Sequence, residues 1–127
     1  MESVLLTEGA GRTKVCLSIQ WIGKDLIICL FNESGHIGAV SVADYCQAED
    51  RASTSVITRF GHKDDSVACH VAHALCKRLK KPVCAIVGIH VDNITGEEIS
   101  QIILNCDTLV EKFVNSAIEP REQKENQ

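Results

Sequence analysis

The chain has 127 residues, 45% of them hydrophobic, which is enough for one compact core. Its 13 basic and 17 acidic residues give a formal net charge of -4, so electrostatics provide no reason to expect a nucleic acid or an anionic membrane as partner. The seven cysteines form no C-x-x-C pair, and no run of about 18 apolar residues could span a membrane. We therefore predict one reduced, cytoplasmic domain over residues 1–118 that binds neither nucleic acid nor membrane.

The first half of the chain has the patterns of β-strands. Residues 13–22 alternate apolar and polar side chains, as in a strand with one buried face. Residues 26–31 are continuously apolar, which predicts a strand covered on both faces. Residues 36–43 and 53–59 predict two further strands, and residues 4–11 are a candidate edge strand.

The second half alternates helix and strand. Residues 64–80 have apolar positions at helical spacing, and Pro82 ends that pattern. Residues 83–89 then predict a buried central strand. Thr95 and Glu98 form a T-x-x-E capping box at the start of a second amphipathic helix.

The predicted order is thus several strands, a helix, a strand and a helix. This order indicates an α/β sandwich, in which a mainly antiparallel sheet of about five or six strands packs against two helices. The apolar stripe of the second helix stops near Ala117. We predict that residues 119–127 form a disordered tail, because they carry no apolar anchor.

Polar residues gather in three stretches at the ends of the predicted elements, where functional groups are often placed. The candidate site residues in these stretches are His36, then Thr54, Ser55, His62, Lys63 and Asp64, and finally His90, Asp92, Asn93 and Thr95.

His90 and Asp92 are two residues apart at the end of a predicted strand, so their side chains point the same way if the strand continues. They could be metal ligands, a histidine with its orienting carboxylate, or a general base pair. Alternatively, Asp92 and Asn93 hydrogen-bond the backbone of a loop. We expect no metal site, because the spacing fixes no third ligand.

Gly61, His62 and Lys63 directly precede a predicted helix, whose free N–H groups favour an anion such as a phosphate. The alternative is that Asp64 or Asp65 already caps those groups. The hydroxyls of residues 53–55 are typical of an edge strand with polar side chains in water.

The cysteines are predicted to be core material rather than nucleophiles. Cys69 and Cys76 lie near the buried stripe of the first helix, and Cys84 and Cys106 are expected within the core. No adjacent feature would lower the pKa of a thiol, so we predict no catalytic cysteine.

Three segments of the sequence resemble a known family. GHIGAVSVA (35–43), TSVITRFGHKDD (54–65) and GIHVDNITGEEI (88–99) are similar to the small LpdD-like proteins, which accompany gallate-type decarboxylases. The resemblance implies an accessory or chaperone role beside a UbiD-type decarboxylase that uses prenylated flavin. It also implies a fold similar to that of the proteasome assembly chaperones, and hence a dimer.

The leading hypothesis is a non-catalytic accessory protein that binds FMN or prenylated FMN transiently, or binds the decarboxylase that uses it. His62 and Lys63 would contact the phosphate, while His36, His90 and Asn93 would contact other polar atoms of the ligand. One alternative is an assembly scaffold that acts only through protein surfaces. Another is a small hydrolase or lyase with His90 and Asp92 as its base; we expect that the protein is not an enzyme.

Overall fold

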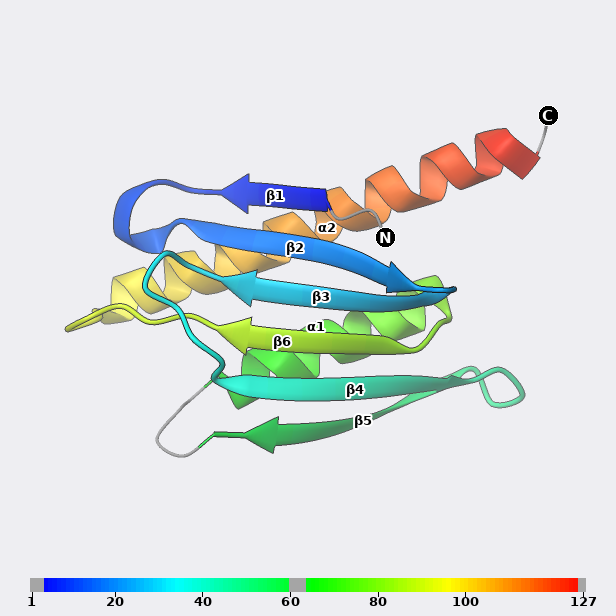
Figure 1. The fold of residues 1–127 in the computed structure, drawn as a ribbon, viewed down its shortest axis with the longest axis horizontal. Coiled ribbons are helices and arrows are strands. Elements are labelled where there is room, and N and C mark those ends of the chain that lie inside the picture. Colours follow the sequence, from blue (N-terminus) through cyan, green and yellow to red (C-terminus); the bar gives the residue numbers. More distant parts are fainter. Residues whose placement is uncertain (1–3, 60–63, 126–127) are drawn as a thin grey trace.

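A computed structural model describes residues 4–59 and 64–125, with side chains up to residue 117. Figure 1 shows one twisted sheet with its helices behind it. The elements are β1 (Val4–Glu8), a 3-10 turn η1 (Gly11–Thr13), β2 (Val15–Ile22), β3 (Asp25–Phe31), β4 (Ala39–Cys46), β5 (Arg51–Thr58), α1 (Asp65–Leu79), β6 (Val83–Gly88) and α2 (Gly96–Glu125).

The six strands are arranged in the order β1-β2-β3-β6-β4-β5. Neighbouring strands are antiparallel except β3 and β6, which are parallel because the chain returns through α1 before it enters β6. The α/β sandwich with a mainly antiparallel sheet is therefore confirmed, and β6 lies centrally as predicted.

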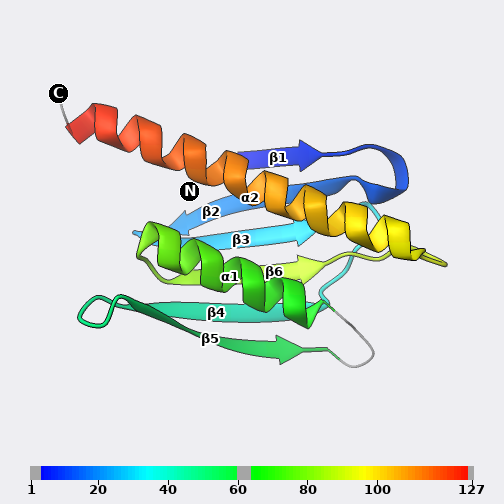
Figure 2. The same ribbon diagram turned by 180° about the vertical axis from the view of Figure 1, so that it is seen from behind.

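Both helices lie on the same face of the sheet (Figure 2). Alternate residues of the strands point to this covered face and are almost completely buried. The largest of them are Val15, Leu17, Ile19, Leu26, Ile28, Leu30, Val83 and Val87. Ser41 is a buried polar residue on this face, and its hydroxyl donates a hydrogen bond of 2.6 Å to the carbonyl of Ala68 in α1. The sheet and the helices thus share one core.

No described element covers the opposite face, which we call the open face. The prediction that residues 26–31 would be covered on both sides was wrong: Ile27, Cys29 and Phe31 point to the open face and remain partly exposed. Cys84 also lies there, half-buried, and not in the core as expected, because its neighbours Val83 and Ala85 face the helices. Cys76 and Cys106 are buried as predicted.

Two strands are shifted from their predicted positions. β4 begins at Ala39 instead of residue 36, because the residues before it form a loop that crosses the end of β6. The β4–β5 hairpin is tighter than expected, so that β5 already begins at Arg51. Its turn contains Asp50 in the left-handed conformation, with φ of 48°, and the carboxylate of Asp50 accepts a hydrogen bond from the hydroxyl of Tyr45.

Helix α2 begins with the predicted capping box. The backbone N–H of Glu98 donates to Thr95 Oγ1, and the N–H of Thr95 donates to Glu98 Oε1, both at 3.1 Å. The helix continues to Glu125, past its predicted end near Ala117, and the disorder of residues 119–127 in solution stays a prediction. Within the described residues, neither helix combines the length and apolar character needed to cross a membrane.

Candidate functional site

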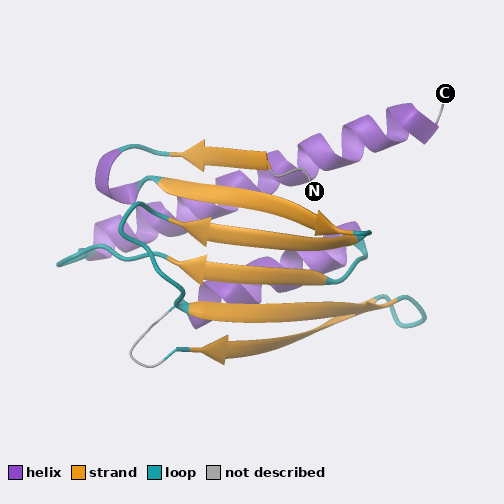
Figure 3. Cartoon of the chain, viewed as in Figure 1, coloured by secondary structure: helices purple, strands orange, loops and turns teal. Residues whose placement is uncertain are grey.

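The loop between β3 and β4 crosses directly over the carboxyl end of β6 (Figure 3). Two glycines allow the two backbones to touch there. A Cβ atom on Gly88 would overlap the carbonyl group of His36, and one on Gly35 would overlap the carbonyl oxygen of Gly88. The N–H of Gly38 donates to the carbonyl of Val87 at 2.9 Å and so fixes the loop to the strand.

This crossing brings His36 beside His90, with 5.8 Å between the ring centroids and 31° between the ring planes. The Nε2 atom of His90 is 2.9 Å from Asp92 Oδ1. Because an ionised carboxylate only accepts hydrogen bonds, the donor in this contact is an Nε2–H of the His90 ring. This contact is compatible with both an orienting carboxylate and a general base pair, and the role of His90 stays a prediction.

Asn32 holds the backbone of His90 from the other side. Its Nδ2 donates to the His90 carbonyl at 2.7 Å, and its Oδ1 accepts from the His90 N–H at 3.1 Å. The side-chain amide thus continues the pairing of β3 with β6 beyond the last strand residue. As a result, His90 has a fixed position relative to the crossing loop.

Arg12 in η1 ties this region to the start of α2. Its Nε donates to Glu98 Oε2 at 2.7 Å, and one terminal nitrogen donates to the carbonyl of Asp92 at 2.6 Å. The hydrogen bond from Arg12, followed by that from the Thr95 N–H, lowers the pKa of Glu98 to about 2. We call this set of contacts the Arg12 latch.

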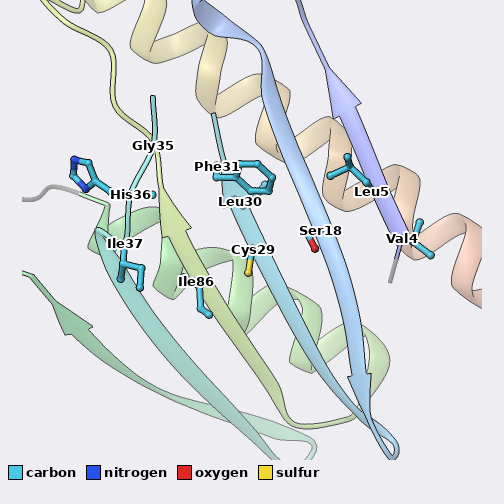
Figure 4. A pocket seen from close by; sticks show the side chains of 11 residues that line it. Val4, Leu5, Ser18, Cys29, Leu30, Phe31, Gly35, His36, Ile37 and Ile86 are labelled. Atoms are coloured by element: carbon cyan, nitrogen blue, oxygen red, sulfur yellow. The ribbon is translucent and has the colours of Figure 1, made fainter. Parts of the chain in front are cut away.

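Two cavities meet at the crossing. The first, of about 520 Å³, lies on the open face, where Ser18, Cys29 and Ile86 project from three neighbouring strands (Figure 4). His36 lies at one end of it. We call it the apolar cavity.

The second cavity, of about 740 Å³, is lined by polar groups that include Arg12, Lys14, Asn32, His90 and Asp92, and we call it the polar cavity. Phe31 lines both cavities. The His36–His90 pair therefore lies where a largely apolar space adjoins a polar one.

A further groove, of about 310 Å³, lies between the beginnings of α1 and α2 and includes Asp64, Ile94 and His90. Asp64 is the N-cap residue of α1, but its side chain makes no capping hydrogen bond to the helix. Its carboxylate lies against Gly38, where a Cβ atom would overlap it. Asp64 therefore lies near the crossing, behind the loop that carries His36.

Residues 9–118 match the sequence profile of the prenylated flavin chaperone LpdD-like domain. The chain belongs to this family. No curated protein matches the sequence. The fold is similar to that of a chain in the crystal structure of a chaperone complex for yeast 20S proteasome assembly, with a TM-score of 0.56 and 12% identity over 92% of this chain and 96% of that one. This likeness confirms the predicted fold.

In this member of the LpdD-like family, the three segments that carry the resemblance all reach the crossing. The first contributes Gly35 and His36, the second Asp64, and the third His90 and Asp92. Thr95 joins the group through the capping box. Asn93 lies in the intervening turn with φ of 52°, a conformation that asparagine tolerates better than most residues.

Two of the other predicted site residues, Thr54 and Ser55, are not brought to the crossing. Thr54 lies in the middle of β5, where its Oγ1 is 3.0 Å from His73 Nδ1 of α1. Ser55 is exposed on the open face, paired in register with Val42. His62 and Lys63, predicted to hold a phosphate, are outside the described residues. Among the described residues, no group of three or more His, Cys, Asp or Glu side chains could hold a metal ion.

Sequence reasoning missed three polar residues that build this site: Arg12, Lys14 and Asn32. Asn32 stands in a sequence that indicates only a turn, and its partner His90 is 58 residues later. Glu98 was recognised as a cap, whereas its ion pair with Arg12 spans 86 residues. The sequence signal that could have identified Arg12 and Asn32 was their position, because each lies at an end of a predicted strand.

Proposed function

We propose that the chain is a non-catalytic accessory protein that transiently binds FMN or prenylated FMN and assists the maturation of a UbiD-type decarboxylase. The observation that carries this proposal is the His36–His90 pair between an apolar and a polar cavity, in a member of a prenylated flavin chaperone family. A flavin nucleotide has the same division, because its ring system is largely apolar and its phosphate end is polar.

The groups at the crossing suit binding better than bond-breaking chemistry. Cys29 is a potential nucleophile in the apolar cavity, but burial, and to a lesser extent Cys84, raise its pKa. A protonated thiol is a poor nucleophile. His90 is held by Asp92 and Asn32 and can offer one ring nitrogen to a ligand without moving.

Titration of the protein with FMN and with prenylated FMN, followed by fluorescence or calorimetry, tests this proposal. We expect His36→Ala and His90→Ala each to weaken binding by about tenfold, as for the loss of a good hydrogen bond. His70→Ala is the matched control, because His70 is an exposed histidine on α1. The proposal fails if neither flavin binds and the protein does not associate with the decarboxylase.

We also propose that the protein is a homodimer that pairs through the open face. The large apolar side chains there include Leu5, Ile22, Val42 and Ile57, which are 60%, 60%, 53% and 75% exposed. Several large, exposed apolar side chains on one face are the kind of surface that an interface buries. Sedimentation equilibrium should give a concentration-dependent mass that approaches twice that of the chain, and a constant single-chain mass would contradict the dimer.

The open face also supports the second candidate, a scaffold that acts through protein surfaces alone. The two functions predict opposite results for the same variants. If the protein is a scaffold, His36→Ala and His90→Ala will leave association with the decarboxylase and its maturation unchanged. If ligand binding is the function, maturation will fall together with flavin affinity.

A further inference from the structure

The two edges of the sheet differ in their protection against pairing with another chain. β1 has only five residues, contacts α2 and ends in Glu8, whose carboxylate pairs with Lys112 of α2 at 2.6 Å. β5, at the opposite edge, has eight residues (Figure 1), and its segment 52–58 contains no charged residue, proline or glycine. Soluble proteins usually shorten an edge strand or place charges or proline in it, because a long uncharged edge is a template for another strand. β5 therefore has the properties of a strand that accepts a partner.

Half of the backbone polar groups of β5 point away from β4. The N–H of Arg59 donates to the carbonyl of Gly38 at 2.9 Å, which continues the register that pairs β5 with β4. Because successive N–H groups along a strand point to opposite sides, those of the odd-numbered residues of β5 point to β4. The N–H and carbonyl groups that point to the other side, which no described strand occupies, belong to Ala52, Thr54, Val56 and Thr58. An added strand would pair with these groups.

Positive charges flank the uncharged part of β5. Arg51 is exposed, and its Nη1 is 4.0 Å from Glu49 Oε2, an ion pair that is weak because both side chains are in water. Arg59 is exposed as well, and its Nη1 donates to the carbonyl of Ile37 at 2.9 Å. Asp50, the second acidic residue of the hairpin turn, already accepts a hydrogen bond from a tyrosine hydroxyl. An arginine therefore lies at each end of the edge strand.

We propose that β5 binds an extended segment of a partner protein as an additional strand, and that this segment has β-branched side chains in its middle and an acidic side chain at each end. In a pairing that uses the whole strand, either direction of the added segment places its two ends opposite Arg51 and Arg59. The added strand would also pack against Ile57, which is 75% exposed. The inference goes beyond the proposed function and does not depend on flavin binding.

A second copy of the chain fits this edge less well than an acidic segment does. If two β5 strands paired antiparallel over their whole length, Arg51 of each copy would lie opposite Arg59 of the other. Like charges that lie directly opposite each other in a sheet are destabilising. Glutamate or aspartate in those two places would form two attractive pairs instead. The charge pattern of the edge therefore favours an acidic partner segment.

The experiment compares two synthetic peptides that are as long as residues 51–59. Both alternate valine and threonine in the middle, but one has glutamate at each end and the other has lysine. We expect the wild-type protein to bind the glutamate-ended peptide about tenfold more tightly, because two attractive cross-strand pairs replace two repulsive ones. Titration of the isotope-labelled protein, followed by its amide NMR signals, gives both dissociation constants. The bound peptide should also slow hydrogen exchange at the amides of Thr54 and Val56, and leave that of β1 unchanged.

Variants of exposed residues of the edge test the charges and the backbone separately. The double variant Arg51→Glu/Arg59→Glu should reverse the preference, so that the lysine-ended peptide binds about tenfold more tightly. Thr58→Pro removes an N–H that points to the added strand and keeps the hydrogen bonds to β4, so it should weaken the glutamate-ended peptide by about tenfold. Thr58→Ala removes most of the same side chain but keeps the N–H. It is the matched control, and its affinity should stay within about twofold of the wild type.

Failure of the glutamate-ended peptide to bind the wild-type protein, or equal affinities for the two peptides, would overturn the inference. So would signal changes that map to another surface, or a charge-reversed double variant that still prefers the glutamate-ended peptide. If the amides of Thr54 and Val56 are protected without peptide and lose this protection on dilution, a second copy occupies the edge and the proposed acidic partner is wrong. The flavin titrations test the proposed function independently of these results.

Discussion

The two faces of the sheet carry apolar side chains of similar size in very different surroundings. On the covered face, Leu17 and Ile28 are completely buried beneath the helices. On the open face, Val42 and Ile57 are 53% and 75% exposed. The covered face therefore accounts for the stability of the single chain, and the apolar residues of the open face need another explanation.

Strand β4 shows the difference most clearly. Its covered side has the small residues Ala39, Ser41 and Ala43, all completely buried. Its open side has the larger Val40 and Val42. The small residues allow α1 to approach closely, whereas valines on an open face add nothing to that packing. Large apolar residues on the uncovered side are what a surface that binds a partner or a ligand requires.

The largest expected effect comes from a matched pair of neighbours on β3. Ile28→Ala removes a buried side chain from the covered face and should lower the free energy of unfolding by about 2–5 kcal/mol. Ile27→Ala removes the same atoms from the open face and should lower it by roughly 1 kcal/mol or less at low protein concentration. Urea unfolding followed by circular dichroism measures both.

The Ile27→Ala and Ile28→Ala variants also test the proposed dimer. If a second copy covers the open face, the destabilisation by Ile27→Ala will grow as the protein concentration rises, because the dimer is lost as well. The destabilisation by Ile28→Ala will not change with protein concentration, because Ile28 lies on the covered face and not in the proposed interface. Equal losses for the two variants at low concentration would show that the two faces do not differ in the way the structure indicates.

The crossing at the end of β6 is the next place to test. Gly88→Ala should lower the free energy of unfolding by about 2–3 kcal/mol, because the added methyl group overlaps the backbone of His36 and one of the two segments must move. Gly96→Ala is the control, since a Cβ atom there meets nothing within 4 Å. Denaturation midpoints give the stabilities. Equal midpoints for the two variants would contradict the contact.

The local patterns of the sequence predicted the elements well. The alternation of residues 13–22 gave β2, and the T-x-x-E box of Thr95 and Glu98 gave the start of α2 to the residue. These features depend on neighbours along the chain, so a single sequence contains them. Which face of a strand the helices would cover is not a local property, and this explains the errors at residues 26–31 and at Cys84.

The candidate site was only partly predictable for the same reason. The stretches with His36 and His90 were identified, because polar residues at element ends are unusual in an apolar pattern. Their meeting depends on the order of the strands, which places the β3–β4 loop over β6. Arg12 and Asn32 reach the site across 80 and 58 residues, and no spacing rule predicts contacts of that range.

A charge on the open face is expected to change the free energy of unfolding less than the core and crossing variants do. Ile57→Lys places an ammonium group at a position that is 75% exposed in the single chain, so its unfolding free energy should change by less than about 0.5 kcal/mol. In the proposed dimer the same charge would be desolvated, and the dissociation constant should rise about tenfold or more. Gln47→Lys, at an exposed position in the hairpin turn, is the control, because it adds the same single positive charge. An unchanged dissociation constant for Ile57→Lys would place the interface elsewhere.

The smallest effect on stability at pH 7 is expected from a change in the Arg12 latch, which joins polar groups at the rim of the covered face. The pKa of Glu98 is about 2 in the folded protein, below its ordinary value of 4.5. Between these two pH values the unfolded chain binds more protons than the folded one, so stability falls as the pH falls from about 4.5 towards 2. Above pH 4.5 the contribution of Glu98 is complete and constant.

Glu98→Gln tests this dependence, because glutamine can still accept the capping hydrogen bond but carries no charge. The variant should lose the part of the acid dependence that lies between pH 4.5 and 2, and at pH 7 it should be only slightly less stable than the wild type. Urea midpoints measured from pH 2 to pH 7 give both quantities, with Glu97→Gln, an acidic neighbour in the same turn, as control. Parallel pH profiles for Glu98→Gln and the wild type would show that Arg12 does not hold Glu98 in solution. The loop that carries His90 and Asp92 would then depend on Asn32 and the glycine crossing alone.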